Sequence, residues 1–147
     1  MLMLPGLTQT GDLPAGVHEA DWPEIEQRFG RGSEARVRAF ARLRHVYELA
    51  DRTGWLQRFL VFGSFVSAVA DPQDIDVVLI MGATFKVEEA PRESRTLFSH
   101  PDAQARFGAS VFWIREGMLS EGAMQEFLDT WQTKRDSTKR GILEVKP

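Results

Sequence analysis

Two short hydrophobic runs separated by a polar turn fill residues 60–81, and they constrain the fold more than any other stretch of the chain. Residues 59–62 contain no polar side chain and are too few for a helix, which is typical of a strand buried on both faces. Residues 71–73, Asp-Pro-Gln, favour a turn. Residues 74–80 are rich in β-branched side chains. The sequence therefore predicts two strands in the buried centre of a sheet.

A Gly-Ser pair follows the first run directly. Gly63 has no Cβ that would keep a ligand away from the backbone. Ser64 is suited to cap a short helix over residues 65–70, and the first amides of a helix favour an anion. We therefore expect Gly63 and Ser64 to hold a phosphate group.

Two aspartates open the second run. Alternation along a strand puts Asp74 and Asp76 on one face, with Cα atoms about 6.6 Å apart. Their carboxylates repel each other unless a cation lies between them. Mg²⁺ commonly takes one or two protein carboxylates and leaves its other positions to water and substrate phosphates. Asp74 and Asp76 are therefore the candidate metal ligands, beside the candidate phosphate site.

This spacing, Gly63-Ser64 followed by nine residues and then Asp74-Ile75-Asp76 on an apolar strand, resembles the signature of the nucleotidyltransferase superfamily. The similarity is closest to small single-domain members, including the minimal nucleotidyltransferases of bacterial two-gene modules. Residues 13–19, Phe107-Gly108 and residues 139–142 also resemble small proteins of this type. The resemblance implies an α/β fold of the α+β type, with a mixed, largely antiparallel sheet and flanking helices.

The resemblance also implies an activity. It implies that an NTP such as ATP binds with Mg²⁺ or Mn²⁺ at Asp74 and Asp76, with its outer phosphates at Gly63 and Ser64. A nucleoside monophosphate would then pass to a hydroxyl group of a protein or an RNA. The expected partners are an NTP and either an RNA acceptor or a protein encoded by a neighbouring gene, as in toxin–antitoxin pairs.

The third acidic position departs from the family pattern. Active members carry a third carboxylate on a later strand, and the corresponding position here is Ser110. A neutral hydroxyl cannot neutralise a divalent ion or act as an effective general base near pH 7. Glu116, Glu88 or Glu89 could replace it if the fold brings one of them near.

Three interpretations of this pattern remain open. The first is a nucleotidyltransferase, and the second is a catalytically degenerate nucleotide- or partner-binding module with an antitoxin-like or regulatory role. The third is a structural α/β domain, in which Gly63 and Ser64 only form a turn and the two aspartates are solvated. Polar residues set among Ile, Val and Leu argue against the third interpretation.

Composition limits the class of protein. A chain of 147 residues predicts one domain, which we place at residues 13–147 after a flexible arm at residues 1–12. The net charge of −3 argues against general nucleic-acid binding. The chain has no cysteine, which excludes disulfides and thiolate metal sites, and no apolar run near the roughly 20 residues of a membrane span. We expect a soluble, cytoplasmic protein that does not bind membranes.

Periodicity predicts the remaining elements. Asp21 and Ser33 are positioned to cap helices over residues 22–29 and 34–53, and a third helix is expected near residues 120–132. One or two short helices are expected within residues 91–107, and strands at 109–114 and 142–145. We predict a sheet of four to six strands, with residues 58–62, 75–80 and 111–114 in its buried centre and helices mainly on one face.

Two groups of basic or titratable residues lie within these elements. Eight arginines fall between Arg28 and Arg58. A solvated helix face is the favoured interpretation, and a platform for an NTP tail or an RNA acceptor is the alternative. His18 and His45 are expected to be structural.

Overall fold

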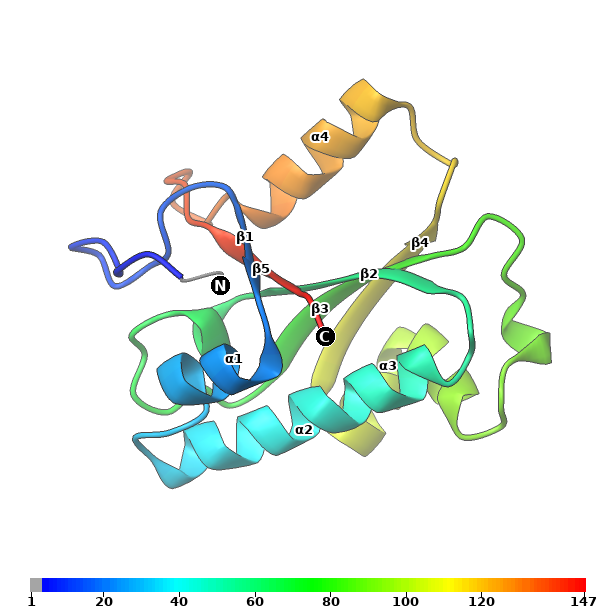
Figure 1. Cartoon of the computed structure of the whole chain (residues 1–147), viewed down its shortest axis with the longest axis horizontal. Coiled ribbons are helices and arrows are strands. Elements are labelled where there is room, and N and C mark those ends of the chain that lie inside the picture. Colours follow the sequence, from blue (N-terminus) through cyan, green and yellow to red (C-terminus); the bar gives the residue numbers. More distant parts are fainter. Residues whose placement is uncertain (1–3) are drawn as a thin grey trace.

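The computed structural model describes residues 4–147, which form a five-stranded sheet with helices on both faces (Figure 1). The strands are β1 (Val17–Ala20), β2 (Leu56–Phe62), β3 (Ile75–Met81), β4 (Ala109–Arg115) and β5 (Ile142–Val145). The helices are α1 (Trp22–Phe29), α2 (Glu34–Asp51), α3 (His100–Phe107) and α4 (Glu121–Trp131), with 3₁₀ turns at Ser64–Val66, Val87–Glu89 and Ser94–Phe98.

The sheet is mixed, and its strand order is β1-β5-β2-β3-β4. Strand β2 pairs antiparallel with β3 and with β5, so the centre of the sheet is antiparallel. The two outer pairs, β1–β5 and β3–β4, are parallel. The expected α+β fold with a mixed sheet and flanking helices is confirmed.

Side-chain caps fix where the helices begin. The carboxylate of Asp21 accepts the backbone N–H of Glu24 at 3.0 Å, and the hydroxyl of Ser33 accepts that of Arg36 at 3.2 Å. Each bond satisfies an amide that has no partner inside the helix. The two helix starts predicted from Asp21 and Ser33 are therefore confirmed.

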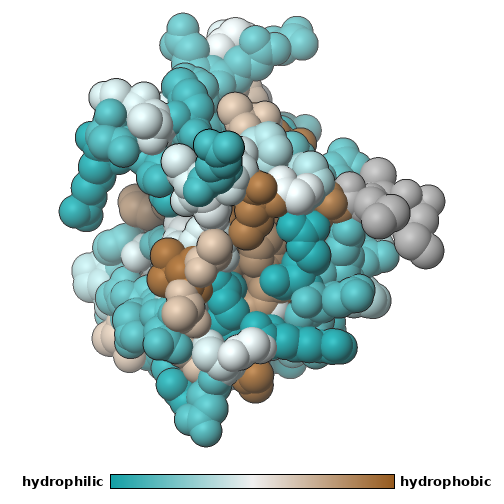
Figure 2. Space-filling model, turned by 90° about the vertical axis from the view of Figure 1, so that its left-hand side faces the viewer, coloured by the Kyte–Doolittle hydropathy of each residue, from teal (hydrophilic) through white to brown (hydrophobic). Residues whose placement is uncertain are grey.

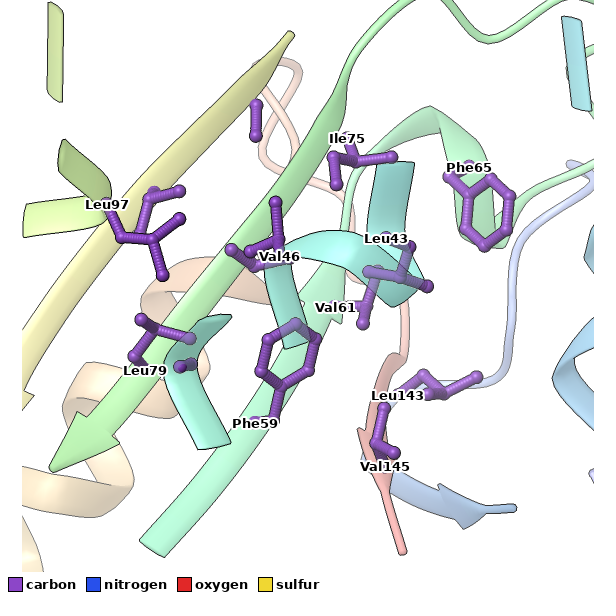
Figure 3. Packing of buried hydrophobic residues seen from close by; sticks show 14 of the residues in the cluster. Leu43, Val46, Phe59, Val61, Phe65, Ile75, Leu79, Leu97, Leu143 and Val145 are labelled. Atoms are coloured by element: carbon purple, nitrogen blue, oxygen red, sulfur yellow. The ribbon is translucent and has the colours of Figure 1, made fainter. Parts of the chain in front are cut away.

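The larger core lies between the sheet and helices α1 to α3. Leu43 and Val46 of α2 pack over Phe59 and Val61 of β2 and over Leu79 of β3 (Figure 3). All five side chains are at most 1% exposed. Because alternate residues of each strand point to this face, their burial fixes which residues of β2 and β3 face the other way.

Among the helices of residues 4–147, α4 alone covers the opposite face. Leu60, Val78 and Ile142 are buried there, and the apolar side of α4 packs on them through Met124, Phe127, Leu128 and Trp131. Asp76 has the same parity as Val78 along β3, so its side chain belongs to this α4 face. The expectation that helices lie mainly on one face is confirmed, with α4 as the exception.

Strand β4 corrects one expectation. Residues 111–114 were expected in the buried centre of the sheet, but β4 pairs only with β3 and forms an edge. Val111 is buried, whereas Phe112 is 36% exposed. The hydrophobic run of β4 reflects its contacts with flanking side chains such as Trp131, whose ring lies 4.7 Å from that of Phe112.

The N-terminal segment lies against the domain, in contrast to the flexible arm expected at residues 1–12, of which residues 1–3 fall outside the described part. Leu4 is 6% exposed, and its N–H donates to the Glu24 carboxylate at 2.6 Å. Arg28 donates to the carbonyl oxygens of Leu4 and Pro5. These bonds tie the segment to α1. Among the described residues, no helix is long and apolar enough to cross a membrane.

A nearly buried ion pair joins β2 to β5. Arg58 donates to both carboxylate oxygens of Glu144, at 2.9 and 2.6 Å, and the Lys146 ammonium lies 3.3 Å away. Burial alone would raise the pKa of Glu144, but the bonds to Arg58 and the charge of Lys146 outweigh it and lower that pKa. A carboxyl group whose pKa is lowered by folding stabilises the fold at pH values above the ordinary pKa of glutamic acid. This stabilisation is lost as the pH falls through the lowered pKa.

We predict that Glu144→Gln lowers the free energy of unfolding at pH 7 by about 2 kcal/mol, the effect of removing a charged hydrogen-bonding partner. The difference from wild type should shrink as pH falls below the ordinary range of glutamic acid. Urea denaturation between pH 3 and pH 7 measures it. Glu34→Gln, which alters an exposed pair with Arg38, is the control. A difference that is independent of pH would contradict the prediction.

Candidate functional site

One row of side chains crosses the sheet at the start of β3. Asp76 pairs with Phe62 of β2 on one side and with Ser110 of β4 on the other. Residues paired across neighbouring strands point to the same face, so all three side chains lie on the α4 face. The structure therefore places Ser110 beside Asp76, where the resemblance puts the third carboxylate.

Gly63 lies directly against the Asp76 carboxylate. A Cβ built on Gly63 would overlap Oδ2 of Asp76, and the backbone of Gly63 has φ +83°, which side chains rarely adopt. The sequence predicts a close approach to the Gly63 backbone. The group that makes this approach is a side chain of the protein itself.

Asp74 lies one residue before β3, which begins at Ile75 and not at Asp74 as expected. Its carboxylate accepts the side-chain amide N–H of Gln104 at 3.2 Å, and the Ser110 hydroxyl donates to the amide oxygen of the same glutamine at 3.0 Å. Gln104 thus connects Asp74 to Ser110. Sequence reasoning missed Gln104, because nothing in the pattern of a short amphipathic helix marks it.

The environment of Asp76 disfavours its charged form. Burial raises the pKa of the Asp76 carboxyl, and the nearby charge of Asp74 raises it further. The nearby Ser110 hydroxyl and the positive charge of Arg140 act in the opposite direction without cancelling the increase in pKa. The Asp76 carboxylate is therefore poorly solvated and is repelled by the charge of Asp74, and a cation would remove this repulsion.

The alternative third ligands lie at the wrong end of the sheet. Glu116 donates its N–H to the carbonyl of Met81, five residues along β3 from Asp76 and therefore about 17 Å away. Glu88 and Glu89 lie in the 3₁₀ turn that follows this same end of β3. None of the three glutamates can replace the missing carboxylate. Across residues 4–147, no group of three or more His, Cys, Asp or Glu side chains is placed to hold a metal ion.

The β2–β3 loop (residues 63–74) does not form the helix that the sequence predicts over residues 65–70. It makes one 3₁₀ turn, Ser64–Val66, and then becomes extended at Ser67. The Ser67 hydroxyl donates to the Ser64 carbonyl at 2.6 Å and accepts the Val69 N–H at 3.2 Å. These side-chain bonds replace the helical bonds, so no helix terminus is available for an anion.

A buried guanidinium holds this loop in place. Arg36 of α2 is 7% exposed and donates to the carbonyl oxygens of Phe65, Ser67 and Val69 in the loop, and to that of Phe29 at the end of α1. Desolvation lowers its pKa. Arg36 therefore departs from the solvated helix face favoured for the arginines, whereas the exposed Arg38, paired with Glu34 at 3.7 Å, fits it.

Ser64 borders a cavity of about 430 Å³. Its lining comes from three segments: the N-terminal segment, the β2–β3 loop and the hairpin formed by residues 133–140. These segments meet on the left-hand side of Figure 1. Two of the lining residues, Lys134 and Arg140, carry positive charge. Sequence reasoning gave neither of them a role, although Arg140 lies within the stretch 139–142 that resembles the superfamily.

Two of the three outer stretches that resemble the superfamily, residues 13–19 and 139–142, also lie close together. Residues 13–19 lead into and form most of β1, which pairs with β5, and residues 139–142 lead into β5. His18 donates from Nε2 to the Pro14 carbonyl at 2.6 Å, so its imidazole is used within the first stretch. A Cβ on Gly141 would overlap the same carbonyl oxygen.

A family model described as a family of unknown function (DUF6932) matches residues 5–146. No curated protein and no solved structure matches the chain.

We predict that Arg36→Met destabilises the protein by at least about 2 kcal/mol, because it leaves buried carbonyl oxygens without a donor. Arg38→Met, on the same helix, should change the free energy of unfolding by less than about 0.5 kcal/mol, since exposed ion pairs contribute little. Urea denaturation of both variants measures the difference. Equal stabilities of the two variants would show that the four carbonyl contacts do not hold the β2–β3 loop.

Proposed function

The chain belongs to DUF6932, a family of unknown function, and we propose that it is a nucleotidyltransferase-like protein that binds an NTP together with Mg²⁺ or Mn²⁺. Asp74 and Asp76 are the proposed metal ligands. Ser64, which borders the neighbouring cavity, is the proposed contact to the outer phosphates, because the Asp76 carboxylate already lies against Gly63.

One observation carries this proposal: Asp76 is partly desolvated over Gly63 while the charge of Asp74 acts on it. A protein bears such repulsion at a cost in stability, which favours a role that needs both charges. Oxygen donors of this kind fit a hard divalent cation, and Mg²⁺ commonly takes one or two protein carboxylates. When bound, the cation would neutralise phosphate oxygens that the two carboxylates alone would repel.

The chain's own residues favour nucleotide binding over nucleotide transfer. Ser110 lies beside Asp76 at the position where an active nucleotidyltransferase has a carboxylate, but its side chain is a neutral hydroxyl. That hydroxyl donates to the amide oxygen of Gln104. We therefore place a binding or regulatory role first, exerted through a protein partner or an RNA. Transfer of a nucleoside monophosphate to a hydroxyl acceptor is the second candidate, favoured by the paired aspartates beside Ser64.

We predict that Asp74→Asn combined with Asp76→Asn abolishes Mg²⁺-dependent NTP binding and leaves the fold intact or slightly more stable, since it removes a charge repulsion together with the cation site. Calorimetric titration with a non-hydrolysable NTP, with and without Mg²⁺, measures the binding. Asp102→Asn, which neutralises an exposed acid on α3, is the control. Wild-type affinity in the double variant would show that the aspartates are not metal ligands.

We predict that Ser110→Asp strengthens Mg²⁺ binding and lowers the melting temperature only when Mg²⁺ is absent, because a third carboxylate joins two like charges. Ser110→Asn is the matched neutral control. Thermal unfolding with and without Mg²⁺ separates the two variants, and labelled NTP detects transfer, which the added carboxylate should raise or create. Unchanged metal affinity, or unfolding despite Mg²⁺, would show that Ser110 is not the third ligand position.

A further inference from the structure

The cavity beside Ser64 has a positively charged wall and a wall of hydroxyl groups. The residues that line this cavity of about 430 Å³ include Lys134 and Arg140 of the 133–140 hairpin and Ser64 and Ser67 of the β2–β3 loop. That volume lies within the usual range for small-ligand sites. The surrounding face is mainly hydrophilic, with a small hydrophobic group near its centre (Figure 2). Its chemistry suits a small anion with several oxygen atoms.

Arg140 carries unused hydrogen-bonding capacity. Its Nε is buried, and within residues 4–147 it has no hydrogen-bond partner. The Arg140 backbone is fixed, because its N–H donates to the Gln132 carbonyl at 2.8 Å. A buried donor without an acceptor is costly, and an anionic ligand would supply that acceptor.

Lys134 is engaged by an acid of the protein. Its ammonium lies 3.0 Å from Oδ2 of Asp12, and the Thr10 hydroxyl donates to the same oxygen at 2.9 Å. Asp12 is 4% exposed and is joined to Ser67 by a β-bridge. A carboxylate of the N-terminal segment thus occupies the position that an external anion would take on Lys134.

We propose that Lys134 and Arg140 bind the β- and γ-phosphates of the nucleotide, and that Asp12 competes with these phosphates for Lys134. This inference rests on the proposed function, because it places the polyphosphate tail of the same NTP next to its metal site. Ser64 borders the cavity and follows Gly63, which touches Asp76, so the loop joins the two sites. The guanidinium and the ammonium supply the donors that the phosphate oxygens need.

The cavity residues also define which ligand it prefers. The residues that line the cavity include two cations and one carboxylate, so their net charge is positive when no ligand is bound. A group with several negative charges can displace Asp12 from Lys134 and still pair with Arg140, whereas a monophosphate offers fewer charges for the same exchange. We therefore expect affinity to rise from monophosphate to triphosphate.

The test uses inorganic tripolyphosphate without metal, measured by calorimetry on the full chain. Arg140→Met should weaken binding by at least about tenfold, the loss expected for one hydrogen bond to a charged group. Lys134→Met should weaken tripolyphosphate binding less, because Asp12 already offsets the charge of the Lys134 ammonium. Asp12→Asn should strengthen tripolyphosphate binding several-fold. Arg135→Met removes an exposed charge of the same hairpin that does not line this cavity, and should leave affinity within about twofold.

Circular dichroism establishes that each variant is folded. If Arg140→Met does not fold, Arg140→Lys, Lys134→Met and Asp12→Asn decide the question instead. Equal tripolyphosphate affinity in wild type and in the folded cavity variants would overturn the inference, as would equal weakening by Arg135→Met or no binding to wild type. An Asp12→Asn variant with wild-type affinity would overturn the competition by Asp12.

The metal site is tested separately, so the two ideas can fail independently. Asp74→Asn with Asp76→Asn should abolish Mg²⁺-dependent NTP binding and leave metal-free tripolyphosphate binding in place. If Mg²⁺-dependent NTP binding is lost in the aspartate variant but is unaffected by Arg140→Met and Lys134→Met, the proposed function stands and this inference falls. If tripolyphosphate binding needs Arg140 while the aspartates have no effect on NTP binding, the anion site stands and the proposed function falls.

Discussion

The buried guanidinium of Arg36 is the contact on which the site depends. One side chain of α2 joins the end of α1 to the β2–β3 loop through four carbonyl oxygens. The arginine is enclosed by peptide dipoles, and a guanidinium can satisfy several of them at once because its donors lie in a fixed plane. This arrangement fixes the loop without a helix, and it sets where Ser64 and Ser67 face the cavity.

A second constraint is the conflict of charge at the start of β3. Hydrophobic burial of β3 is the main source of stability there, yet Asp76 lies in the same strand and is desolvated beside Asp74. A fold selected only for stability would place an apolar or neutral residue at this position. The conflict lies at the proposed metal site, whereas the charges of Arg58 and Glu144, on the same face of the sheet, neutralise each other.

The sequence predicted the elements whose signals are local, and missed those set by distant contacts. Periodicity and caps identified α2 and the strands β2 and β3, but the four residues of β1 (17–20) are too few and too polar to stand out, and the hydrophobic run at 111–114 cannot show whether its strand is central or at an edge. Asp76 was predictable from spacing, and its neighbour Ser110 from the resemblance to the superfamily pattern. Arg36 and Arg140 were not, because their roles depend on loops that come from far away in the chain, and nothing in the pattern of a short amphipathic helix marks Gln104.

The close contact between Gly63 and Asp76 links two positions that are separated by a whole loop. Two features exclude a side chain at position 63: the carboxylate of Asp76 and the positive φ angle of the Gly63 backbone. The identity of residue 63 therefore depends on the identity of residue 76. During evolution, a lineage that shortens residue 76 removes one of the two barriers to changing residue 63. Covariation of these two positions among relatives would then show in which lineages the acidic site was lost. A glycine at 63 together with an aspartate at 76 would mark the lineages that keep the site.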